Sequence, residues 1–486
     1  MGKTDPGLVF PHQENGFAEL CKFCMIISVL ALLPFRAEAE LTFHPSAELS
    51  ATWLDNVDLA SNGVLKKEEY VYQITPAFTF EQKSPRMDST LAYKMRNLYY
   101  QNDKDRSERY HQLDAGSTVE LLSDYFYVDG LADYTQQLVD PGKQTNTDLL
   151  FQVNNVSDVA TVSISPYLFH EFDGTLADLR YRRGWVNFKD DIVAGSLLED
   201  VDTEIYTAAF GSADPESRLS WQLRYDAQSA NYKLSPAFNF ESATAEVGLL
   251  LMRTLRLIGR GGFESDIGHG KTDGGLDYAT WDTGLRWEPS QRTQVQALYG
   301  ERSFGKTYNV RINHKARLVE LTASYVQEPT TLGQELVLRP VTQQQAATQV
   351  LLPGMPNFDR ITSDVYVRKD VEGGMEINGR RNQFQLSGFK FHRDFLAKEL
   401  VEEFKGGRAA YTRQLSAALS FLLDGRYSNV KTRDNDAYIE RFYRTGLNVQ
   451  VDKRISIHLT GQQIQRKGDL LSYKANWITL AFKGEY

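Results

Sequence analysis

Residues 278–288 read YATWDTGLRWE, and apolar and polar side chains alternate along them. In an extended strand, one side would carry Ala279, Trp281, Leu285 and Trp287, and the other Thr280, Asp282, Arg286 and Glu288. Because successive side chains of a strand point to opposite faces, this period of two predicts a β-strand with one apolar and one polar face. A soluble β-sandwich alternates in the same way, so the period by itself leaves two fold classes open.

The same period recurs from one end of the chain to the other. It is clear in LSWQLRYDA (219–227), in ISIHLT (455–460) and in ITLAFKGEY (478–486), which ends on the aromatic Tyr486. We count roughly 22 strand-like segments, most of them as long as the roughly 9–11 residues that a tilted strand needs to cross a bilayer.

The connections between these segments are short and long in turn. Short ones are expected at 84–88, 122–124, 173–174, 214–216, 253, 289–291, 315–316, 378–382, 415–416 and 452–453, and longer ones at 55–69, 138–158, 189–201, 266–277, 328–361 and 394–407. Outer-membrane barrels have tight periplasmic turns and long extracellular loops, whereas a sandwich has no reason to sort its connections. The sequence therefore predicts an all-β fold, a transmembrane antiparallel β-barrel of roughly 18–22 strands.

The first 39 residues have the features of a secretory signal peptide. Lys22 precedes the apolar run CMIISVLALLPF (24–35), and an A-x-A cleavage pattern follows at 37–39. The lead before Lys22 is long, which an upstream start codon would explain. Both cysteines, Cys21 and Cys24, lie in this segment. We expect a single barrel domain over residues 40–486, located in the cell outer membrane.

Two of the long connections contain candidate helices. FLAKELVEEFKGG (395–407) has apolar residues at helical spacing and ends in a Gly pair, and VTQQQAATQVLLPG (341–354) is a weaker candidate. The second candidate lies in the longest connection, 328–361, which is long enough to fold over the mouth or into the lumen. Connections of this size are either functional or disordered, and both alternatives stay open.

GERSFGKT (300–307) matches the phosphate-binding pattern G-x-x-x-x-G-K-[ST] letter for letter. That pattern binds nucleotides only between a buried strand and a helix N-terminus. Here alternating sequence flanks it on both sides, in TQVQALYG (293–300) and YNVRINH (308–314). The sequence therefore predicts a tight outer hairpin and no nucleotide as a partner. The net charge of −9 also gives no reason to expect nucleic acid.

The polar positions of the alternating segments are expected to line the lumen. The candidates are Ser220, Gln222, Arg224, Asp226, Asp282, Arg286, Gln294, Gln296 and His458. Their mixed charges, amides and hydroxyls suit hydrated solutes and can bind sugar hydroxyls. Any wide barrel must, however, be polar inside, so a wall without specificity is the alternative.

The sequence offers no catalytic, cofactor-binding or metal-binding constellation. The eight histidines are scattered, and no G-x-S-x-G elbow occurs. DIGHGKTDGG (266–275) lacks the residue order and closing Glu of a calcium loop. A barrel hydrolase leaves no local signature, but we expect no enzyme and no cofactor.

Several short motifs in a fixed order resemble one family. They are SATWLDNV (50–57), SPYLFHEF (165–172), WEPSQRT (287–293), YGERSFGKTY (299–308) with His314 and Arg317, SYVQEPTT (324–331), VYVRKD (365–370) and NGRRNQFQLSGF (378–389). The chain resembles the PEP-CTERM/exosortase-system-associated outer-membrane proteins, which occur with exopolysaccharide genes. The resemblance implies a barrel and that genomic setting, and it carries over no functional residue.

Two functions remain open at this point. The first is a channel or conduit for polysaccharide or related solutes. The second is a non-conducting structural or surface-assembly barrel whose outer loops bind polymer or protein. Expected partners are outer-membrane lipid and lipopolysaccharide, the barrel-assembly machinery through the C-terminal strand ending at Tyr486, and polysaccharide export proteins.

Overall fold

The structure is a computed structural model, and it describes residues 40–143, 149–151, 154–190, 192–193, 196–269, 272–338, 361–396, 400–432 and 436–486. The weaker helix candidate, 341–354, lies outside these ranges. Within them, no helix has the length and apolar character needed to cross a membrane.

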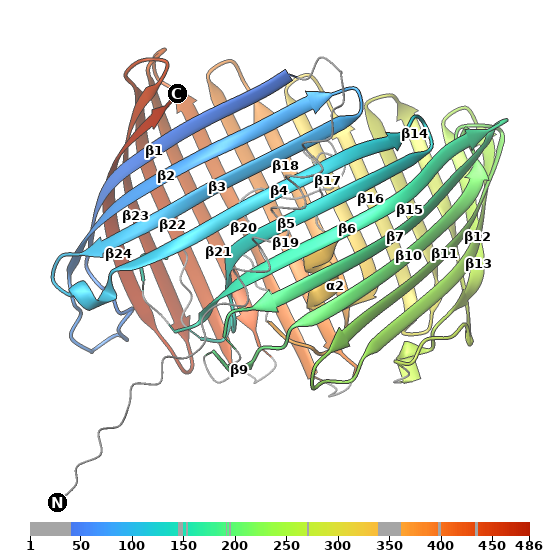
Figure 1. Ribbon diagram of the computed structural model, residues 1–486, viewed down its shortest axis with the longest axis horizontal. Helices are drawn as coiled ribbons and strands as arrows, with labels where there is room; N and C mark the ends of the chain where they lie inside the picture. Colours follow the sequence, from blue (N-terminus) through green and yellow to red (C-terminus); the bar gives the residue numbers. More distant parts are fainter. Residues whose placement is uncertain are drawn as a thin grey trace, which may run out of the picture. The chain divides into compact units, whose positions relative to one another are not determined.

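The described chain forms a closed antiparallel barrel of 22 strands (Figure 1). Each strand pairs with the next along the chain, and β24 pairs with β1 to close the sheet, with Ser46 opposite Glu485. The strands are β1 (Glu40–Leu54), β2 (Glu69–Ser84), β3 (Met87–Tyr100), β4 (Glu108–Leu122), β5 (Phe126–Leu138), β6 (Val156–Phe172), β7 (Thr175–Phe188), β10 (Val201–Ser212), β11 (Leu219–Tyr232), β12 (Phe238–Met252), β13 (Leu255–Glu264), β14 (Tyr278–Ser290), β15 (Thr293–Arg302), β16 (Gly305–Lys315), β17 (Val319–Thr330), β18 (Tyr366–Asn378), β19 (Asn382–Phe395), β20 (Leu400–Gln414), β21 (Leu419–Lys431), β22 (Ala437–Gln450), β23 (Ile455–Gly468) and β24 (Tyr473–Glu485). The predicted fold class is confirmed.

Smaller elements lie in the connections. They are the 3-10 helices η1 (Lys104–Arg106) and η2 (Ile267–His269), the short strand pair β8 (Ile192–Val193) and β9 (Ser196–Leu197), and the helix α2 (Leu332–Val337).

The two faces of the barrel wall differ as the alternation predicts. One face exposes large apolar side chains, including Trp221, Trp281 and Trp287, which are 37%, 44% and 48% exposed. Trp281, Tyr299, Tyr308 and Tyr325 form a continuous row of ring contacts across β14–β17 on this face. An apolar face that is uncovered by protein and crossed by an aromatic row is typical of the lipid-facing side of an outer-membrane barrel.

The connections are sorted between the two ends of the barrel. At one end, the turn end, every connection has six residues or fewer, and Glu40 and Glu485 lie there too. The other end, the loop end, carries the long connections 55–68, 139–155, 189–200, 265–277 and 331–365. The predicted asymmetry of the connections is therefore confirmed.

The segment 300–307 is a hairpin between β15 and β16, as predicted from its flanks. Arg302 is opposite Gly305, and Ser303 and Phe304 form the turn. Gly305 has a φ of +105°, a backbone conformation that residues with a Cβ rarely adopt. This position therefore needs glycine for the turn rather than for a phosphate.

The predicted helix at 395–407 is wrong. β19 continues to Phe395, and 400–407 belong to β20, which pairs with β19 and β21. Along β20 the burial alternates, with Val401 42% exposed between the half-buried Leu400 and the fully buried Glu402. The predicted long connection at 394–407 shrinks to residues 396–399 for the same reason.

Candidate functional site

A short helix, α2, begins the connection between β17 and β18 with a capping box. The backbone N–H of Gln334 donates to Thr331 Oγ1 at 3.3 Å, and the Thr331 N–H donates to Gln334 Oε1 at 3.2 Å. Two backbone N–H groups that have no partner within the helix are thus satisfied at its N-terminus. Six residues of helix are marginal alone, so its position depends on packing.

That packing takes α2 across the barrel. The helix contacts β6, β7 and β10, although β17, which leads into it, is separated from β7 by the seven strands β10–β16. In Figure 1, α2 lies inside the ring of strands. The wall face that touches α2 is therefore the inner face of the barrel.

The contact between α2 and the wall is close and specific. Leu332, Leu336 and Val337 are buried, at 3%, 3% and 0% exposed. Arg182 Nη1 on β7 donates to the Val337 carbonyl at 3.3 Å. A methyl group added at Gly184 would lie 2.5 Å from the Val337 side chain, so only glycine permits this approach. The wall is shaped to receive this helix.

An apolar cluster surrounds α2 at the loop end, and we call it the α2 cluster. It draws residues from several connections as well as from the wall. Its buried members are Val139, Val159, Val186, Val193, Leu198, Val201, Ala230, Phe238, Phe240, Ile267, Leu332, Leu336, Val337, Ile361 and Val367.

A second connection, 139–155 between β5 and β6, also reaches across the barrel. Arg466 on β23 is buried, and it donates hydrogen bonds to the carbonyls of residues 141–143, the one to Pro141 being 3.4 Å long. Phe151 packs edge-on against Trp477 of β24, with 5.1 Å between ring centroids. The Ile361 N–H donates to the Val139 carbonyl at 3.1 Å, so the two inward connections touch each other.

Arg466 is held in place by its own neighbours. Its guanidinium stacks over the Tyr438 ring, 3.5 Å from the centroid, and lies 3.7 Å from the carboxylate of Asp436. Asp436 lies in the connection between β21 and β22, where burial raises the pKa of its carboxyl. The arginine therefore joins the β5–β6 connection to the opposite wall through groups that are themselves packed.

Between its two ends, the inner wall carries arginine–carboxylate pairs. Arg180 on β7 pairs with Asp129 on β5 at 2.8 Å. Arg260 on β13 bridges Glu246 on β12 at 2.7 Å and Asp282 on β14 at 3.3 Å. The Arg260 group joins neighbouring strands, whereas Arg180 and Asp129 meet across β6, and both sets present fixed charges of both signs to the interior.

Four of the sequence-predicted wall residues lie together on β11. Ser220, Gln222, Arg224 and Asp226 share one face of β11. Across the sheet, Asp226 is paired with Thr207 on β10, and Thr207 is paired with Arg180 on β7. Since Arg180 lies on the inner face, these four residues lie on the inner face too. Arg224 Nε and Asp226 Oδ2 are 2.6 Å apart. Ser220 Oγ accepts a hydrogen bond from Arg256 Nη1 at 2.9 Å.

Four of the other predicted wall residues lie on the adjacent strands β14 and β15, and the fifth, His458, lies on β23. Arg286 donates to Gln296 at 3.4 Å, and Gln294 donates to the Glu288 carboxylate at 2.7 Å. Asp282 is part of the Arg260 group described above. His458 on β23 is separate from all of them and contacts Ser456 Oγ at 2.9 Å.

A further charged group on β20–β22 was missed from the sequence. Asp424 is 3% exposed and pairs with Arg408 at 2.7 Å and Arg444 at 3.1 Å. Arg426 lies over the Phe442 ring, 4.1 Å from its centroid. The available signal was an arginine at an alternating polar position on each of three consecutive predicted strands.

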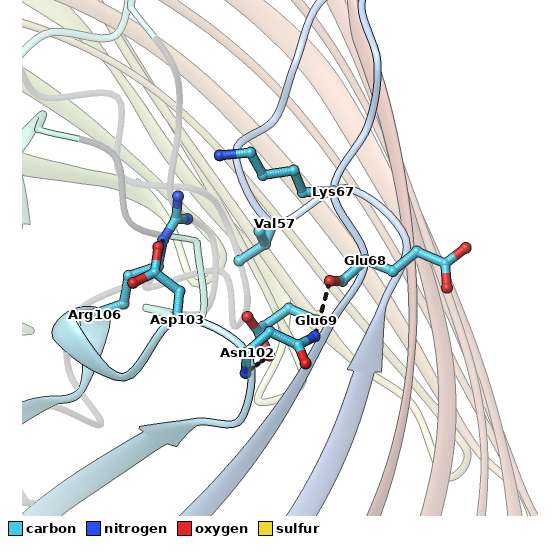
Figure 2. A pocket seen from close by; sticks show the side chains of 7 residues that line it. All are labelled: Val57, Lys67, Glu68, Glu69, Asn102, Asp103 and Arg106. Atoms are coloured by element: carbon cyan, nitrogen blue, oxygen red, sulfur yellow. Dashed lines mark hydrogen bonds and ion pairs between the residues drawn. The ribbon is translucent and has the colours of Figure 1, made fainter.

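A pocket of about 380 Å³ lies among the connections at the loop end. Figure 2 shows its lining, which comes from the β1–β2 and β3–β4 connections and from the start of β2. Arg106 contacts Asp103 at 2.8 Å and Asp58 at 2.6 Å. Burial alone would lower the pKa of Arg106, but these two carboxylates outweigh it and raise the pKa. Lys67 also lies 3.5 Å from Asp58, so both cations of the lining are paired within the protein, and we infer no ligand for this pocket.

Among the residues that the structure describes, no group of three or more His, Cys, Asp or Glu is placed to hold a metal ion. No protein-family model and no curated protein matches the chain.

Solved structures of outer-membrane proteins resemble the chain in fold. A mutant of the ferric enterobactin receptor PfeA from Pseudomonas aeruginosa is 9% identical with a TM-score of 0.50, covering 91% of this chain and 80% of its own. The FrpB iron transporter from Neisseria meningitidis is 9% identical with a TM-score of 0.49, covering 91% and 82%. OpdK from P. aeruginosa is 7% identical with a TM-score of 0.34, covering 91% and 99%. At 9% identity, the likeness to the PfeA receptor mutant concerns the fold alone.

Proposed function

We propose that the chain is an outer-membrane conduit for polysaccharide or related hydrated solutes, with its loop end outside the cell. One observation carries the proposal. The inner wall presents paired charges between the two ends of the barrel, while two connections fold inward and pack on distant parts of the wall at the loop end. A polar inner wall suits the passage of hydrated solutes. Because loops rather than a separate domain block the lumen, movement of these loops would open it.

The family resemblance in the sequence motifs supports the link to exopolysaccharide. Arginine–carboxylate pairs and amides on the wall, such as Gln222 and Gln296, can exchange hydrogen bonds with sugar hydroxyls. The proposed solute is accordingly a hydrated polymer or its fragments rather than an apolar molecule.

The alternative is a barrel that conducts nothing and binds polymer or protein through its outer loops. The extent of the closure favours it, because α2 and the β5–β6 connection both pack on buried apolar residues. If these loops block the lumen permanently, the protein can bind a partner only through the outer surface of its loops.

Cysteine labelling tests whether the inner wall is reached by water. Residues 40–486 contain no cysteine, so one introduced thiol reports on one position. A membrane-impermeant maleimide is expected to label Gln222→Cys and to leave the matched control Leu223→Cys unlabelled, because these neighbours lie on opposite faces of β11. Equal labelling of both would contradict a membrane-embedded barrel with a wet interior.

A secretion assay tests the solute. A strain that lacks the gene should export less exopolysaccharide, and the intact chain should restore export. Normal export by the deletion strain, combined with no conductance of the purified protein in planar bilayers, would favour the structural alternative.

A further inference from the structure

The outer surface of β18–β24 is basic near the loop end. Seven basic side chains lie there, each within five residues of the terminus of its strand at the loop end. We call these seven residues the basic strip. They are Lys369, Lys390, Lys405, Lys431, Arg441, Lys467 and Lys474.

Register places the basic strip on the outward face. Lys390 is opposite Val371, which is 44% exposed, and Arg441 is opposite Tyr427, which is 43% exposed. Arg466, the neighbour of Lys467, points inward to the β5–β6 connection, so Lys467 points outward.

The height of the basic strip matches the headgroup region of a bilayer. Tyr427 and Tyr443 are exposed on the same face, one to two side-chain positions closer to the turn end. Exposed tyrosines of a barrel lie at the membrane–water interface. Basic residues immediately beyond them therefore face the polar headgroups of the leaflet at the loop end.

The carboxylates nearby do not neutralise the basic strip. Asp394 pairs with Lys369 at 2.6 Å, and Glu403 lies 3.3 Å from Lys390 and 3.0 Å from Lys405. Within the described part of the chain, no carboxylate pairs with the remaining members, Lys431, Arg441, Lys467 and Lys474. Four positive charges on this face are left for a ligand.

The opposite side of the barrel differs. On β7, the outward Arg183 lies 2.7 Å from Glu204 and 3.8 Å from Asp202, so its charge is met within the protein. In the part of the chain that the structure describes, the outward arginine of β7 is therefore paired, unlike Lys431, Arg441, Lys467 and Lys474 of the basic strip.

We propose that the basic strip binds the phosphate groups of a phosphorylated glycolipid of the outer leaflet, of the lipopolysaccharide type. Each Lys or Arg near an anionic lipid surface contributes about fivefold in affinity. Several unpaired cations at headgroup height recognise phosphates fixed on a lipid better than a free anion, because the bilayer holds those phosphates at the same level. The proposal rests on the proposed membrane location but not on the conducted solute.

Native mass spectrometry of the full chain in detergent tests this proposal. The probes are bisphosphorylated lipid A, dephosphorylated lipid A, inorganic phosphate and a soluble acidic polysaccharide. The intact chain should bind the bisphosphorylated lipid at least about tenfold more tightly than the dephosphorylated lipid.

The variant Lys431→Gln/Arg441→Gln/Lys467→Gln should lose about tenfold or more of that affinity. The matched control Arg183→Gln/Lys189→Gln/Lys306→Gln changes three basic residues near the loop end of other strands and should keep it. Heat-dependent mobility in detergent gels shows whether each variant is folded.

Three results would overturn the proposal. They are equal binding by the variant and the control, no preference for the phosphorylated lipid, and competition by inorganic phosphate at similar affinity. Binding of the acidic polysaccharide that is lost in the variant would assign the basic strip to polymer instead. Loss of lipid affinity with unchanged conductance separates this inference from the proposed conduit.

Discussion

Replacing Val337 by Asp should release α2 from the wall and raise the conductance of the barrel. Val337 is 0% exposed and sits against Gly184, where there is no space for a hydrated carboxylate. Losing the burial of a valine costs about 1.5–3 kcal/mol. An unpaired carboxylate in the same place adds at least about 2 kcal/mol.

The sum, about 4 kcal/mol, shifts the ratio of docked to undocked α2 by roughly a thousandfold. The two other buried anchors of the helix, Leu332 and Leu336, stabilise the docked state by an amount of similar size. The variant should therefore spend a large fraction of its time undocked while the 22 strands stay paired.

Single-channel recording in planar bilayers measures this shift. Val337→Asp should open more often or to a higher conductance than the intact chain. Val64→Asp is the matched control. It is the same substitution at a residue of the β1–β2 connection that is 59% exposed, so it removes no buried contact. Gly184→Leu should act like Val337→Asp from the wall side, since its side chain would occupy the place of Val337. If both variants are folded and conduct like the intact chain, α2 does not limit the path.

Three more outcomes are expected. Arg466→Ala removes the donors to the carbonyls of residues 141–143 and should raise conductance by freeing the second connection, an effect absent from Lys467→Ala on the outward face. Asp424→Asn leaves Arg408 and Arg444 without their carboxylate, so it should lower the free energy of unfolding by about 3 kcal/mol and shift the reversal potential toward anion selectivity; an unchanged potential would contradict a wet site there. Gly305→Val should destabilise the hairpin by about 1–3 kcal/mol in urea unfolding, because of its positive φ, whereas Lys306→Ala should not.

The wall of the barrel was predictable because it is encoded locally. In 278–288 the polarity of most residues matches the side of the strand on which they lie, with Thr283 as an exception on the apolar face, and this pattern needs no reference to any distant residue. The alternation of short turns and long connections is also written into the chain, and it selected a barrel over a sandwich. The alternating segments on both sides of 300–307 identified it as a hairpin, although its sequence matches a phosphate-binding motif.

The segment 395–407 shows where local reading fails. Leu396, Leu400 and Phe404 are four residues apart, which fits one face of a helix and also one face of a strand. Only the hydrogen bonds to β19 and β21 distinguish the two, and those partners are tertiary.

The inward path of the two long connections was likewise decided by the tertiary structure. α2 docks because Gly184, some 150 positions earlier in the chain, leaves room for Val337, and the β5–β6 connection stays inside because Arg466 lies more than 300 positions later. The sequence alone determined a cylinder with an apolar outside and a polar inside, since each strand carries both faces. Which segments close that cylinder depends on contacts between residues that meet only once the sheet has closed.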